Sequence, residues 1–518
     1  MSDCLGNLFL DAHNEQKTYK LPIHSIRMAF ETKEPAKNDL GITVKKSEDF
    51  SEWYQQAIIK SELIEYGPVS GCMIIRPYGY AIWEKAQAFF DKEIKKRGIK
   101  NAYFPLLIPE SLFNKEKEHV AGFSPEVAWV THGGNSLLPE RLGIRPTSET
   151  IMYDSYRKWI RSHRDLPILI NQWCNIVRWE FKHPVPFLRT REFLWQEGHT
   201  AHATSKETQE MVLNIVELYR QLFEDVYAVA VWKGMKSEQE KFAGAVYTTS
   251  VETLFPNGKA IQGATSHFLG QNFSKSFDIN FLNESGEREY AWQTSWGFST
   301  RSIGMMLGIH GDDKGLIIPP RVAPILVVIV PIIFDNTMDK VLAASRTLQE
   351  ELSVSTYHGE ALSVFIDDSD YKPGWKFNQW ELKGVPLRIE LGPKDLEKGH
   401  AILVRRDTGE KIVVALRDIA TSVPKLLDAI QEHLLFKSKK LLEESVVAAI
   451  DMKQFSEVIN EKKVVFAPFC NNSECEDNIK AATGAKTLNS PLDQKNPVMK
   501  CISCGGETRT LFYFGKSY

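Results

Sequence analysis

The sequence predicts an α+β protein of several domains, and three observations support this. Its 518 residues are too many for one hydrophobic core, so two or three domains plus an extension are expected. Amphipathic helices and short strands are mixed over the first 320 residues, whereas strands and helices alternate regularly from about residue 324 to 416. We place the segments at 1–45 for an N-terminal extension, followed by domains at 46–320, 321–430 and 431–518.

The first predicted helix runs from Tyr80 to Arg97. Its apolar residues recur every four positions, and basic residues precede Gly98, which is a typical C-terminal stop. The segment from Asn101 to Pro109 reads as a strand interrupted by prolines. Because proline cannot donate to a ladder, we expect this strand at a sheet edge, where it would suit a contact between chains.

Two strands joined by a long turn are expected between Trp173 and Trp195, where aromatic and basic residues surround several prolines. Thr204 and Glu207 have the spacing of a capping box, and the apolar stripe that follows predicts an amphipathic helix. That helix is predicted to be structural.

The region from Pro324 to Leu416 predicts a separate α/β domain. Strands, helices and a final hairpin with a turn at Asp407 to Gly409 follow one another. A helical segment from Val423 to about Ile450 leads into the last domain.

Net charge and hydropathy limit the classes of partner that the protein can have. The net charge of −3 neither supports nor excludes RNA, since local basic patches can bind a polyanion. The longest apolar run, Ala323 to Phe334, is far shorter than a spanning helix requires. No signal pattern is evident at the start, so we expect a cytoplasmic protein with no membrane partner.

Four cysteines cluster near the end with the spacing Cys-x4-Cys, 25 residues, Cys-x2-Cys. Four thiolates suit tetrahedral zinc, and a reducing compartment argues against two disulfides. We therefore predict a closed, structural Zn²⁺ site whose ligands are Cys470, Cys475, Cys501 and Cys504.

The densest chemistry lies between Arg178 and Glu197, where Arg178, Arg189 and Arg191 stand among aromatic residues and carboxylates. Arginine forks match phosphate or carboxylate oxygens, so this cluster suggests an anion. A solvated basic hairpin that pairs with its own glutamates is the alternative for an isolated cluster. Three other segments weigh against that alternative: 145–149, 262–267 and 296–304.

Taken in order, these segments resemble the signature motifs of class II aminoacyl-tRNA synthetases, specifically the prolyl-tRNA synthetases of eukaryotic and archaeal type. The resemblance covers about residues 49–518, and runs such as Phe187 to Glu197 are too long to match by accident. It implies a catalytic core on an antiparallel sheet at 46–320, an α/β anticodon-binding domain at 321–430 and a zinc-binding α/β domain at 431–518. About 65 residues between the second motif and Gln262 leave no room for an inserted editing domain.

The resemblance also implies roles for individual residues. Arg178 and Arg301 would be catalytic, Arg178 holding the substrate carboxylate and the α-phosphate and Arg301 meeting the outer phosphates. ATP, with Mg²⁺ bridging its phosphates, would further contact Glu180, Arg189, Thr190, Gln262, Thr265 and Ser299. Relatives often carry threonine in place of Ser299, and the hydroxyl is kept.

Recognition of L-proline would fall, besides Arg178, to Thr147, Glu149, His267, Phe193, Trp195 and Glu197. A prolinium amine has two N–H donors, so one carboxylate and one hydroxyl or carbonyl satisfy it. Arg388 and Glu390 are candidate readers of the tRNA(Pro) anticodon, although two charges on one strand face are more often an internal ion pair. A homodimer through the first motif is implied as well.

Two other functions remain open. One is a synthetase-like tRNA-binding or regulatory protein that has lost catalysis, which predicts broken motifs. Arg178, Arg301, Thr147 and Glu149 are all present. The other is a synthetase for threonine, serine or glycine, and the lack of a zinc-ligand spacing in the catalytic domain speaks against threonine.

Overall fold

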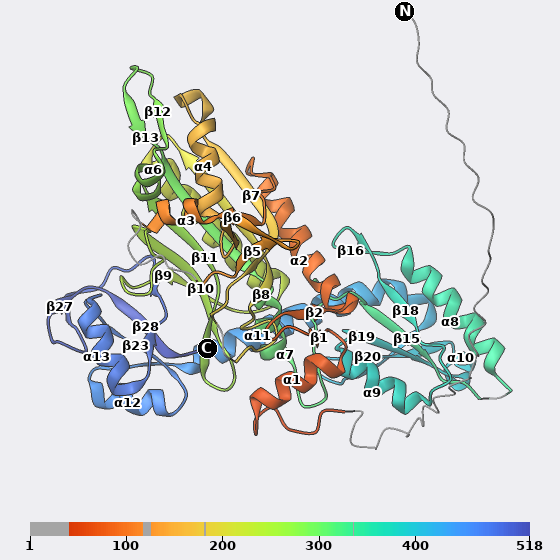
Figure 1. The fold of residues 1–518 in the computed structure, drawn as a ribbon. Coiled ribbons are helices and arrows are strands. Elements are labelled where there is room, and N and C mark those ends of the chain that lie inside the picture. Colours follow the sequence, from red (N-terminus) through yellow and green to blue (C-terminus); the bar gives the residue numbers. More distant parts are fainter. Residues whose placement is uncertain (1–40, 118–125, 181–182, 335) are drawn as a thin grey trace, which may run out of the picture. The chain divides into compact units, whose positions relative to one another are not determined.

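A computed structural model describes residues 41–117, 126–180, 183–334 and 336–518 (Figure 1). Gly41 to Tyr518 form one compact unit. The predicted extension at 1–45 therefore lies almost wholly outside the described residues.

The main sheet has the strand order β22-β23-β28-β11-β14-β8-β7-β3. Its centre is antiparallel, and the two strands predicted between Trp173 and Trp195 are confirmed as neighbours in it. The long central strands are β7 Ile168–Val177, β8 Glu192–His202, β10 Tyr247–Leu254, β11 Lys259–Gly270 and β14 Trp292–Ser299.

One face of this sheet packs on two helices, α2 Pro77–Lys95 and α5 Ser205–Gln221. The Phe298 ring lies 5.1 Å from that of Phe90 on α2 and 5.8 Å from that of Tyr219 on α5. Since side chains alternate along a strand, the residues beside Phe298 face the opposite side. The opposite face of the sheet is not covered by these two helices and can therefore hold a functional site.

Both helices agree with the sequence predictions. The apolar residues of α2 spaced four apart are buried, and the capping box of α5 forms with both of its hydrogen bonds, between Thr204 and Glu207. The proline-rich segment gives only two short strands. β3 Lys100–Asn101 pairs with β7 at the end of the main sheet, and β4 Leu107–Pro109 pairs with β6 Ser136–Ile144.

The other elements of this region are short or peripheral. They are α1 Phe50–Lys60, β1 Ile64–Tyr66, β2 Met73–Ile75, α3 Glu110–Lys117, β5 Trp129–Gly133, α4 Glu149–Trp159, β9 Trp232–Met235, α6 Asn272–Phe277, β12 Asn280–Leu282, β13 Arg288–Tyr290 and α7 Arg301–His310.

The predicted α/β domain is confirmed as a five-stranded sheet in the order β18-β15-β19-β20-β21, whose first three strands are parallel. Its elements are β15 Val327–Pro331, α8 Met338–Ser353, β16 Thr356–Tyr357, β17 Glu360–Ala361, β18 Val364–Ile366, α9 Pro373–Lys383, β19 Leu387–Leu391, α10 Pro393–Glu397, β20 His400–Arg405 and β21 Lys411–Ala415. The Arg406 guanidinium joins this domain to the preceding one through two hydrogen bonds to Asp312, of 2.6 and 2.8 Å.

A single helix, α11 Ile419–Ser445, continues through the predicted domain boundary at 430/431. The last domain then begins with β22 and adds its strands to the main sheet, because β28 runs parallel to β11 at Ala260. This docking was not predicted from the sequence. The elements are β22 Val446–Ala448, α12 Met452–Asn460, β23 Val464–Pro468, α13 Ser473–Thr483, β24 Lys486–Thr487, β25 Ser490–Pro491, β26 Met499–Lys500, β27 Glu507–Thr508 and β28 Leu511–Ser517.

Among the described residues, no helix combines the length and the apolar character that crossing a bilayer requires.

Candidate active site

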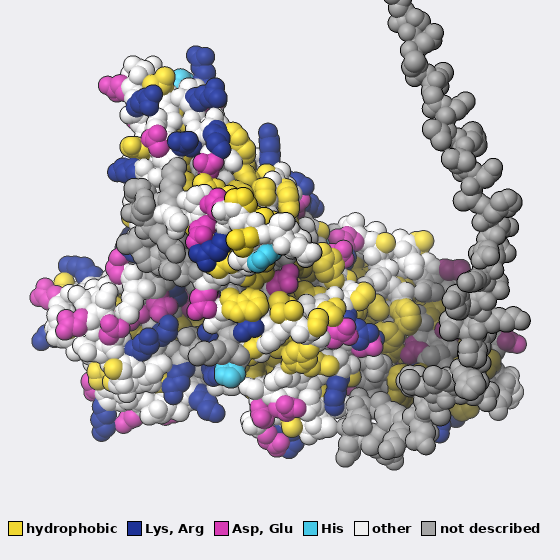
Figure 2. Space-filling model, in the orientation of Figure 1, with side chains coloured by type: hydrophobic (Ala, Val, Ile, Leu, Met, Phe, Trp, Pro, Cys, Tyr) yellow, Lys and Arg dark blue, Asp and Glu magenta, His cyan; other side chains and the backbone are white. Residues whose placement is uncertain are grey.

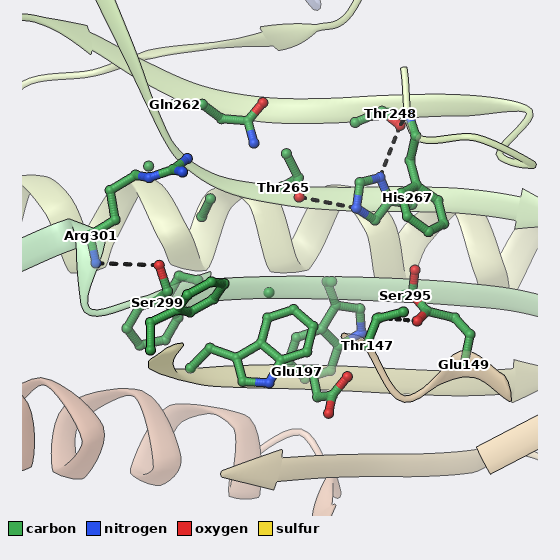
Figure 3. A pocket seen from close by; sticks show the side chains of 18 of the residues that line it. Thr147, Glu149, Glu197, Thr248, Gln262, Thr265, His267, Ser295, Ser299 and Arg301 are labelled. Carbon is green, nitrogen blue, oxygen red and sulfur yellow. Dashed lines mark hydrogen bonds between the residues drawn. The ribbon is translucent and has the colours of Figure 1, made fainter. Parts of the chain in front are cut away.

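A cavity of about 270 Å³ opens on the face of the main sheet away from α2 and α5 (Figure 3). Three strands make its floor, and their registers place side chains in rows. His199, Ser295 and His267 stand side by side in one row, on β8, β14 and β11. The next row has Glu197, Gly297 and Thr265. Alternate residues of three paired strands therefore meet in one cavity.

The cavity brings together most of the residues predicted from separate motifs. Those on its lining are Thr147, Glu149, Arg178, Phe193, Trp195, Glu197, Gln262, Thr265, His267, Ser299 and Arg301.

Two half-buried arginines mark the cavity as an anion site. Arg178 follows β7, and its Nε donates to the carbonyl of Pro146 at 3.0 Å. Arg301 opens α7, and its Nε donates to the carbonyl of Leu188 at 3.0 Å. These backbone contacts fix each guanidinium on one edge, and both side chains border the cavity. Fixed guanidinium groups are suited to planar anionic groups.

Burial lowers the pKa of both arginines. For Arg301 the pKa falls to about 10, with the positive charges of Arg178 and Arg189 adding to the effect of burial. Negative charge on Glu180, Glu149 and Glu197 partly offsets the lowering for Arg178. The arginines therefore repel one another, and a bound polyanion would relieve that repulsion.

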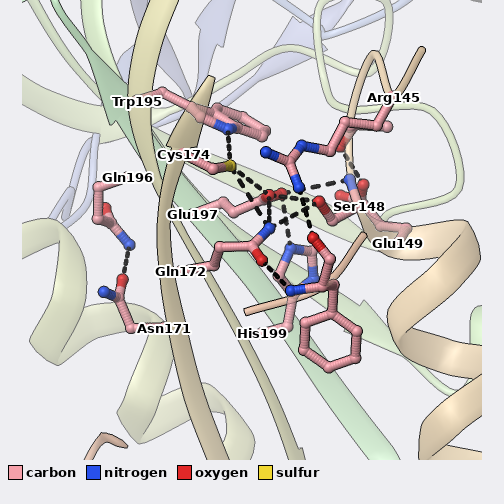
Figure 4. Close-up of polar contacts among 12 residues, drawn as sticks. Arg145, Ser148, Glu149, Asn171, Gln172, Cys174, Trp195, Gln196, Glu197 and His199 are labelled. Atoms are coloured by element: carbon pink, nitrogen blue, oxygen red, sulfur yellow. Dashed lines mark hydrogen bonds and ion pairs between the residues drawn. The ribbon is translucent and has the colours of Figure 1, made fainter. Parts of the chain in front are cut away.

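Glu197 is held on several sides at the wall of the cavity (Figure 4). Its carboxylate accepts hydrogen bonds from the Ser148 hydroxyl, from Gln172 Nε2 at 2.9 Å and from Cys174 Sγ at 3.4 Å. His199 Nε2 lies 3.2 Å from it as a buried ion pair. Burial alone would raise the pKa of Glu197, but these hydrogen bonds and the His199 charge keep it below its usual value.

The segment before α4 supplies a hydroxyl and a carboxylate. The Thr147 hydroxyl donates a hydrogen bond to the Glu149 carboxylate. Ser148 occupies the N-cap position, yet its side chain makes no capping bond and donates to Glu197 instead. The side chains of Thr147, Ser148 and Glu149 therefore interact with one another or with Glu197 at the cavity, and none of them caps the helix.

His267 is a neutral member of the lining. Burial and, to a lesser extent, the His199 charge lower its pKa to about 3. Both ring nitrogens are engaged, Nδ1 with the Thr248 hydroxyl at 2.9 Å and Nε2 with the Thr265 hydroxyl at 3.0 Å. The ring of Phe242 lies 4.6 Å away.

Three predicted residues lie outside this lining. Arg189 borders a neighbouring cavity of about 220 Å³ that also contacts Arg301 and Gln262. Thr190 borders a different cavity, next to Phe193. Glu180 is exposed and acts on Arg178 through its charge.

Sequence reasoning missed several lining residues, including His199, Phe242, Thr248 and Ser295. A signal existed for His199, because Phe193, Trp195, Glu197 and His199 alternate along β8 on one face. No comparable signal marks Phe242, which lies in a loop.

The four predicted zinc ligands converge in the last domain. Cys470, Cys475, Cys501 and Cys504 have their sulfurs within 4.8 Å of one another. Cys470 Sγ lies 3.6 Å from Cys475 Sγ and 4.0 Å from Cys504 Sγ. A tetrahedron with Zn–S bonds of about 2.3 Å has edges of about 3.8 Å, so the cluster fits zinc.

Arg388 and Glu390 contact each other on β19. Arg388 Nη2 lies 2.9 Å from Glu390 Oε1, and both side chains are buried. Glu381 and Lys411 complete the network at 3.3 and 3.2 Å. The internal ion pair weighed at the sequence level therefore forms.

Three family models match the chain. The class II core domain of tRNA synthetases for G, H, P, S and T matches residues 135–310, an anticodon-binding domain matches 326–426, and the C-terminal domain of prolyl-tRNA synthetase matches 452–518. The chain is also similar to the cytoplasmic proline–tRNA ligase of Arabidopsis thaliana, at 50% identity over 92% of this chain and 91% of the relative.

Two more relatives agree. The bifunctional glutamate/proline–tRNA ligase of mouse is 47% identical over 92% of this chain and 33% of its own length. The crystal structure of prolyl-tRNA synthetase from Cryptosporidium parvum, complexed with halofuginone and AMPPNP, superposes with a TM-score of 0.88 at 49% identity. It covers 92% of this chain and 100% of that chain.

Proposed function

Because the chain belongs to the family of proline–tRNA ligases and therefore joins proline to transfer RNA, we propose that both reaction steps occur in the cavity that Arg178 and Arg301 border. L-Proline and ATP give prolyl-adenylate and pyrophosphate, and the prolyl group then passes to the 3′-terminal ribose of tRNA(Pro) with release of AMP. The observation that carries this proposal is the meeting of two half-buried arginines and the Thr147–Glu149 pair in one cavity. The intact motif residues give no support to an inactive homologue.

Arg178 is the proposed residue at the reacting atoms. The carboxylate of proline must approach the α-phosphorus of ATP, which brings two anions together. A guanidinium fixed by Pro146 offsets their repulsion and sets the angle of attack. No protein nucleophile is needed, since the substrate carboxylate is the nucleophile and pyrophosphate is the leaving group.

The proline ring is proposed to lie between Trp195, Phe193 and the His267 row. Glu149 would accept from the prolinium nitrogen, and the Thr147 hydroxyl, which lines the cavity and donates to Glu149, would orient that carboxylate. Glu197 is fully engaged by its protein partners, so it supports the wall rather than binding the amine.

The nucleotide is proposed to lie toward Ser299 and Arg301, at the other end of the cavity in Figure 3. Gln262 and Arg301 border both this cavity and the neighbouring one that contains Arg189, so the outer phosphates would have cationic partners on two sides. Thr265 and Ser299 would offer hydroxyls to ATP, and Glu180 and Thr190 would contact it from the segment after β7. Glu240 borders both cavities and pairs with Lys486, and its carboxylate is of the kind that would hold Mg²⁺ beside the phosphates.

The region 321–430 is proposed to bind the anticodon of tRNA(Pro), in agreement with the family model that matches it. Arg388 and Glu390 remain weak candidates for base recognition, because the ion pair between them would have to open or present its outer edge. Zn²⁺ is proposed to occupy the cluster of Cys470, Cys475, Cys501 and Cys504, with a structural role.

A homodimer through the first motif is proposed from an exposed apolar surface. Tyr103 and Leu137 are each 73% exposed, and Tyr80 on α2 and Leu107 on β4 are also exposed. Figure 2 shows hydrophobic side chains gathered on this face of the molecule. Exposed apolar patches of this kind mark protein contacts. Sedimentation that finds only monomer at micromolar concentration would contradict the dimer.

A cytoplasmic location is also proposed, because the name of the Arabidopsis relative describes that protein as cytoplasmic.

Proline-dependent exchange of labelled pyrophosphate into ATP tests the proposed chemistry. The intact protein should support exchange with proline, weakly with alanine, and not with threonine. Arg178→Ala should abolish exchange while the protein stays folded by circular dichroism. Absence of exchange with proline in the intact protein would refute the proposed function.

A further inference from the structure

A buried hydroxyl without a partner lies on the floor of the catalytic cavity. The Ser295 side chain is 1% exposed and borders the cavity. Its Oγ hydrogen-bonds no group in the part of the chain that the structure describes. Leaving a buried hydroxyl unpaired is unfavourable, so a partner is expected to enter with a ligand.

The nearest candidates in the protein are already engaged. Ser295 stands in register between His267 on β11 and His199 on β8. Both nitrogens of His267 contact threonine hydroxyls. His199 uses Nε2 for Glu197 and Nδ1 for the Tyr153 hydroxyl, at 3.2 Å each. Neither imidazole has a nitrogen to spare for Ser295.

Position along the strand assigns Ser295 to the amino-acid end of the cavity. Ser295 and Ser299 share one face of β14 four residues apart, which is about 13 Å in an extended strand. Gly297 lies between them, where a Cβ would come within 2.9 Å of the Gln196 carbonyl. Figure 3 shows Ser295 at the same end as Thr147 and Glu149, with Ser299 and Arg301 at the other.

We propose that Ser295 Oγ accepts a hydrogen bond from the amino group of the bound amino acid, as a specificity residue in addition to Thr147 and Glu149. This inference rests on the proposed function of the cavity. A prolinium nitrogen carries two N–H donors. Glu149 takes one, and since the Thr147 hydroxyl is directed at Glu149, Thr147 orients the carboxylate while Ser295 receives the second donor.

Ser295→Ala tests the assignment, and Ser266→Ala is a matched control. Ser266 lies on the adjacent strand β11, is fully buried, and likewise has an Oγ without a partner among the described residues. Ser266 is not part of the cavity lining. The two variants thus remove equivalent hydroxyls, one facing the cavity and one outside it.

In proline-dependent pyrophosphate exchange, Ser295→Ala should raise the KM for proline about tenfold or more, the loss expected for one hydrogen bond to a charged group. The KM for ATP and the thermal midpoint should stay near those of the intact protein. Ser266→Ala should leave the KM for proline unchanged, and Ser295→Cys, with a weaker acceptor, should fall between the two.

Several outcomes would overturn the assignment. These are equal KM values for proline in Ser295→Ala and Ser266→Ala, an equal rise in the KM for ATP, or a loss confined to alanine as substrate. The last would mean that Ser295 is a spare acceptor for the third N–H of a primary amine. If the intact protein shows no exchange with proline, the proposed function fails instead, which distinguishes the two failures.

Discussion

His199 Nε2 lies 3.2 Å from Glu197 Oε2, and each side chain is only 1% exposed. Burial would lower the pKa of His199, but the hydrogen bond to Glu197 and the charges of Glu149 and Glu197 raise it above 6.5. The neutral His267 lies in the same row. The wall of the cavity therefore carries one imidazole whose pKa is raised and one whose pKa is lowered.

This relationship predicts how stability depends on pH. The raised pKa of His199 means that its contribution is complete below about pH 6.5 and is lost as pH rises through the folded value. The lowered pKa of Glu197 means that its contribution is complete above about pH 4.5 and is lost as pH falls through the folded value. The pair should therefore stabilise the protein most between these two limits.

His199→Ala should lower the free energy of unfolding of the catalytic region by about 3 kcal/mol near pH 5.5, because Glu197 loses its charged partner in a buried site. The difference from the intact protein should shrink above neutral pH. Denaturation in urea between pH 5 and 9, followed by tryptophan fluorescence, measures it.

His202→Ala is the control for that series. Burial lowers the pKa of His202 to about 4, so His202 destabilises the intact protein as pH falls from 6.5 toward 4. The cost of His202→Ala should therefore decrease toward acid pH, whereas the cost of His199→Ala decreases toward alkaline pH. If the costs of His199→Ala and His202→Ala changed in the same direction with pH, the raised pKa of His199 and the lowered pKa of His202 could not both be right.

Arg178→Lys should lower kcat for pyrophosphate exchange at least a hundredfold while keeping the positive charge. Lysine cannot hold the Pro146 carbonyl and present a planar fork to two anions at once. Steady-state kinetics with saturating proline and ATP measures the change. Arg191→Lys is the matched control, because Arg191 donates to the Ser70 carbonyl and stacks on Trp179, away from the cavity lining.

Much of the architecture was predictable because it depends on local signals. The capping box at Thr204, the strand pair around Arg178 and the alternation after Pro324 are periodic or short-range patterns, and each forms as expected. Docking of β28 on β11 was not predictable, since it joins residues about 250 apart through backbone hydrogen bonds that leave no side-chain pattern.

The site was predictable in the same uneven way. Motif residues such as Arg178 and Arg301 were identified through resemblance to a family, and the cavity brings them together. Ser295 and Thr248 were missed because a single hydroxyl on a buried strand looks like any core residue. Only the register of three strands shows that they border the cavity.

The joint between the catalytic and α/β domains gives a prediction that separates the two reaction steps. The Asp312 carboxylate accepts hydrogen bonds from both terminal nitrogens of the buried Arg406. These hydrogen bonds help to hold the pKa of Asp312 below its usual value despite burial. Asp312→Ala should loosen the joint and slow aminoacylation of tRNA about tenfold, while pyrophosphate exchange changes less than twofold. Asp313→Ala, which removes a contact to Lys46 instead, should affect neither step as strongly, and equal losses in both assays would contradict the prediction.

Metal removal tests the last domain. Cys501 is buried within the sulfur cluster, so Cys501→Ser should abolish the one equivalent of zinc expected per chain and lower the thermal midpoint of the protein by several degrees. Because β28 of this domain pairs with β11 beside the catalytic cavity, exchange activity should fall with heating sooner than in the intact protein. Mass spectrometry measures the zinc content, and calorimetry measures the thermal midpoint. Cys72→Ser removes a thiol outside the cluster and should keep the zinc and the midpoint, whereas zinc retained at full stoichiometry in Cys501→Ser would exclude the four-sulfur site.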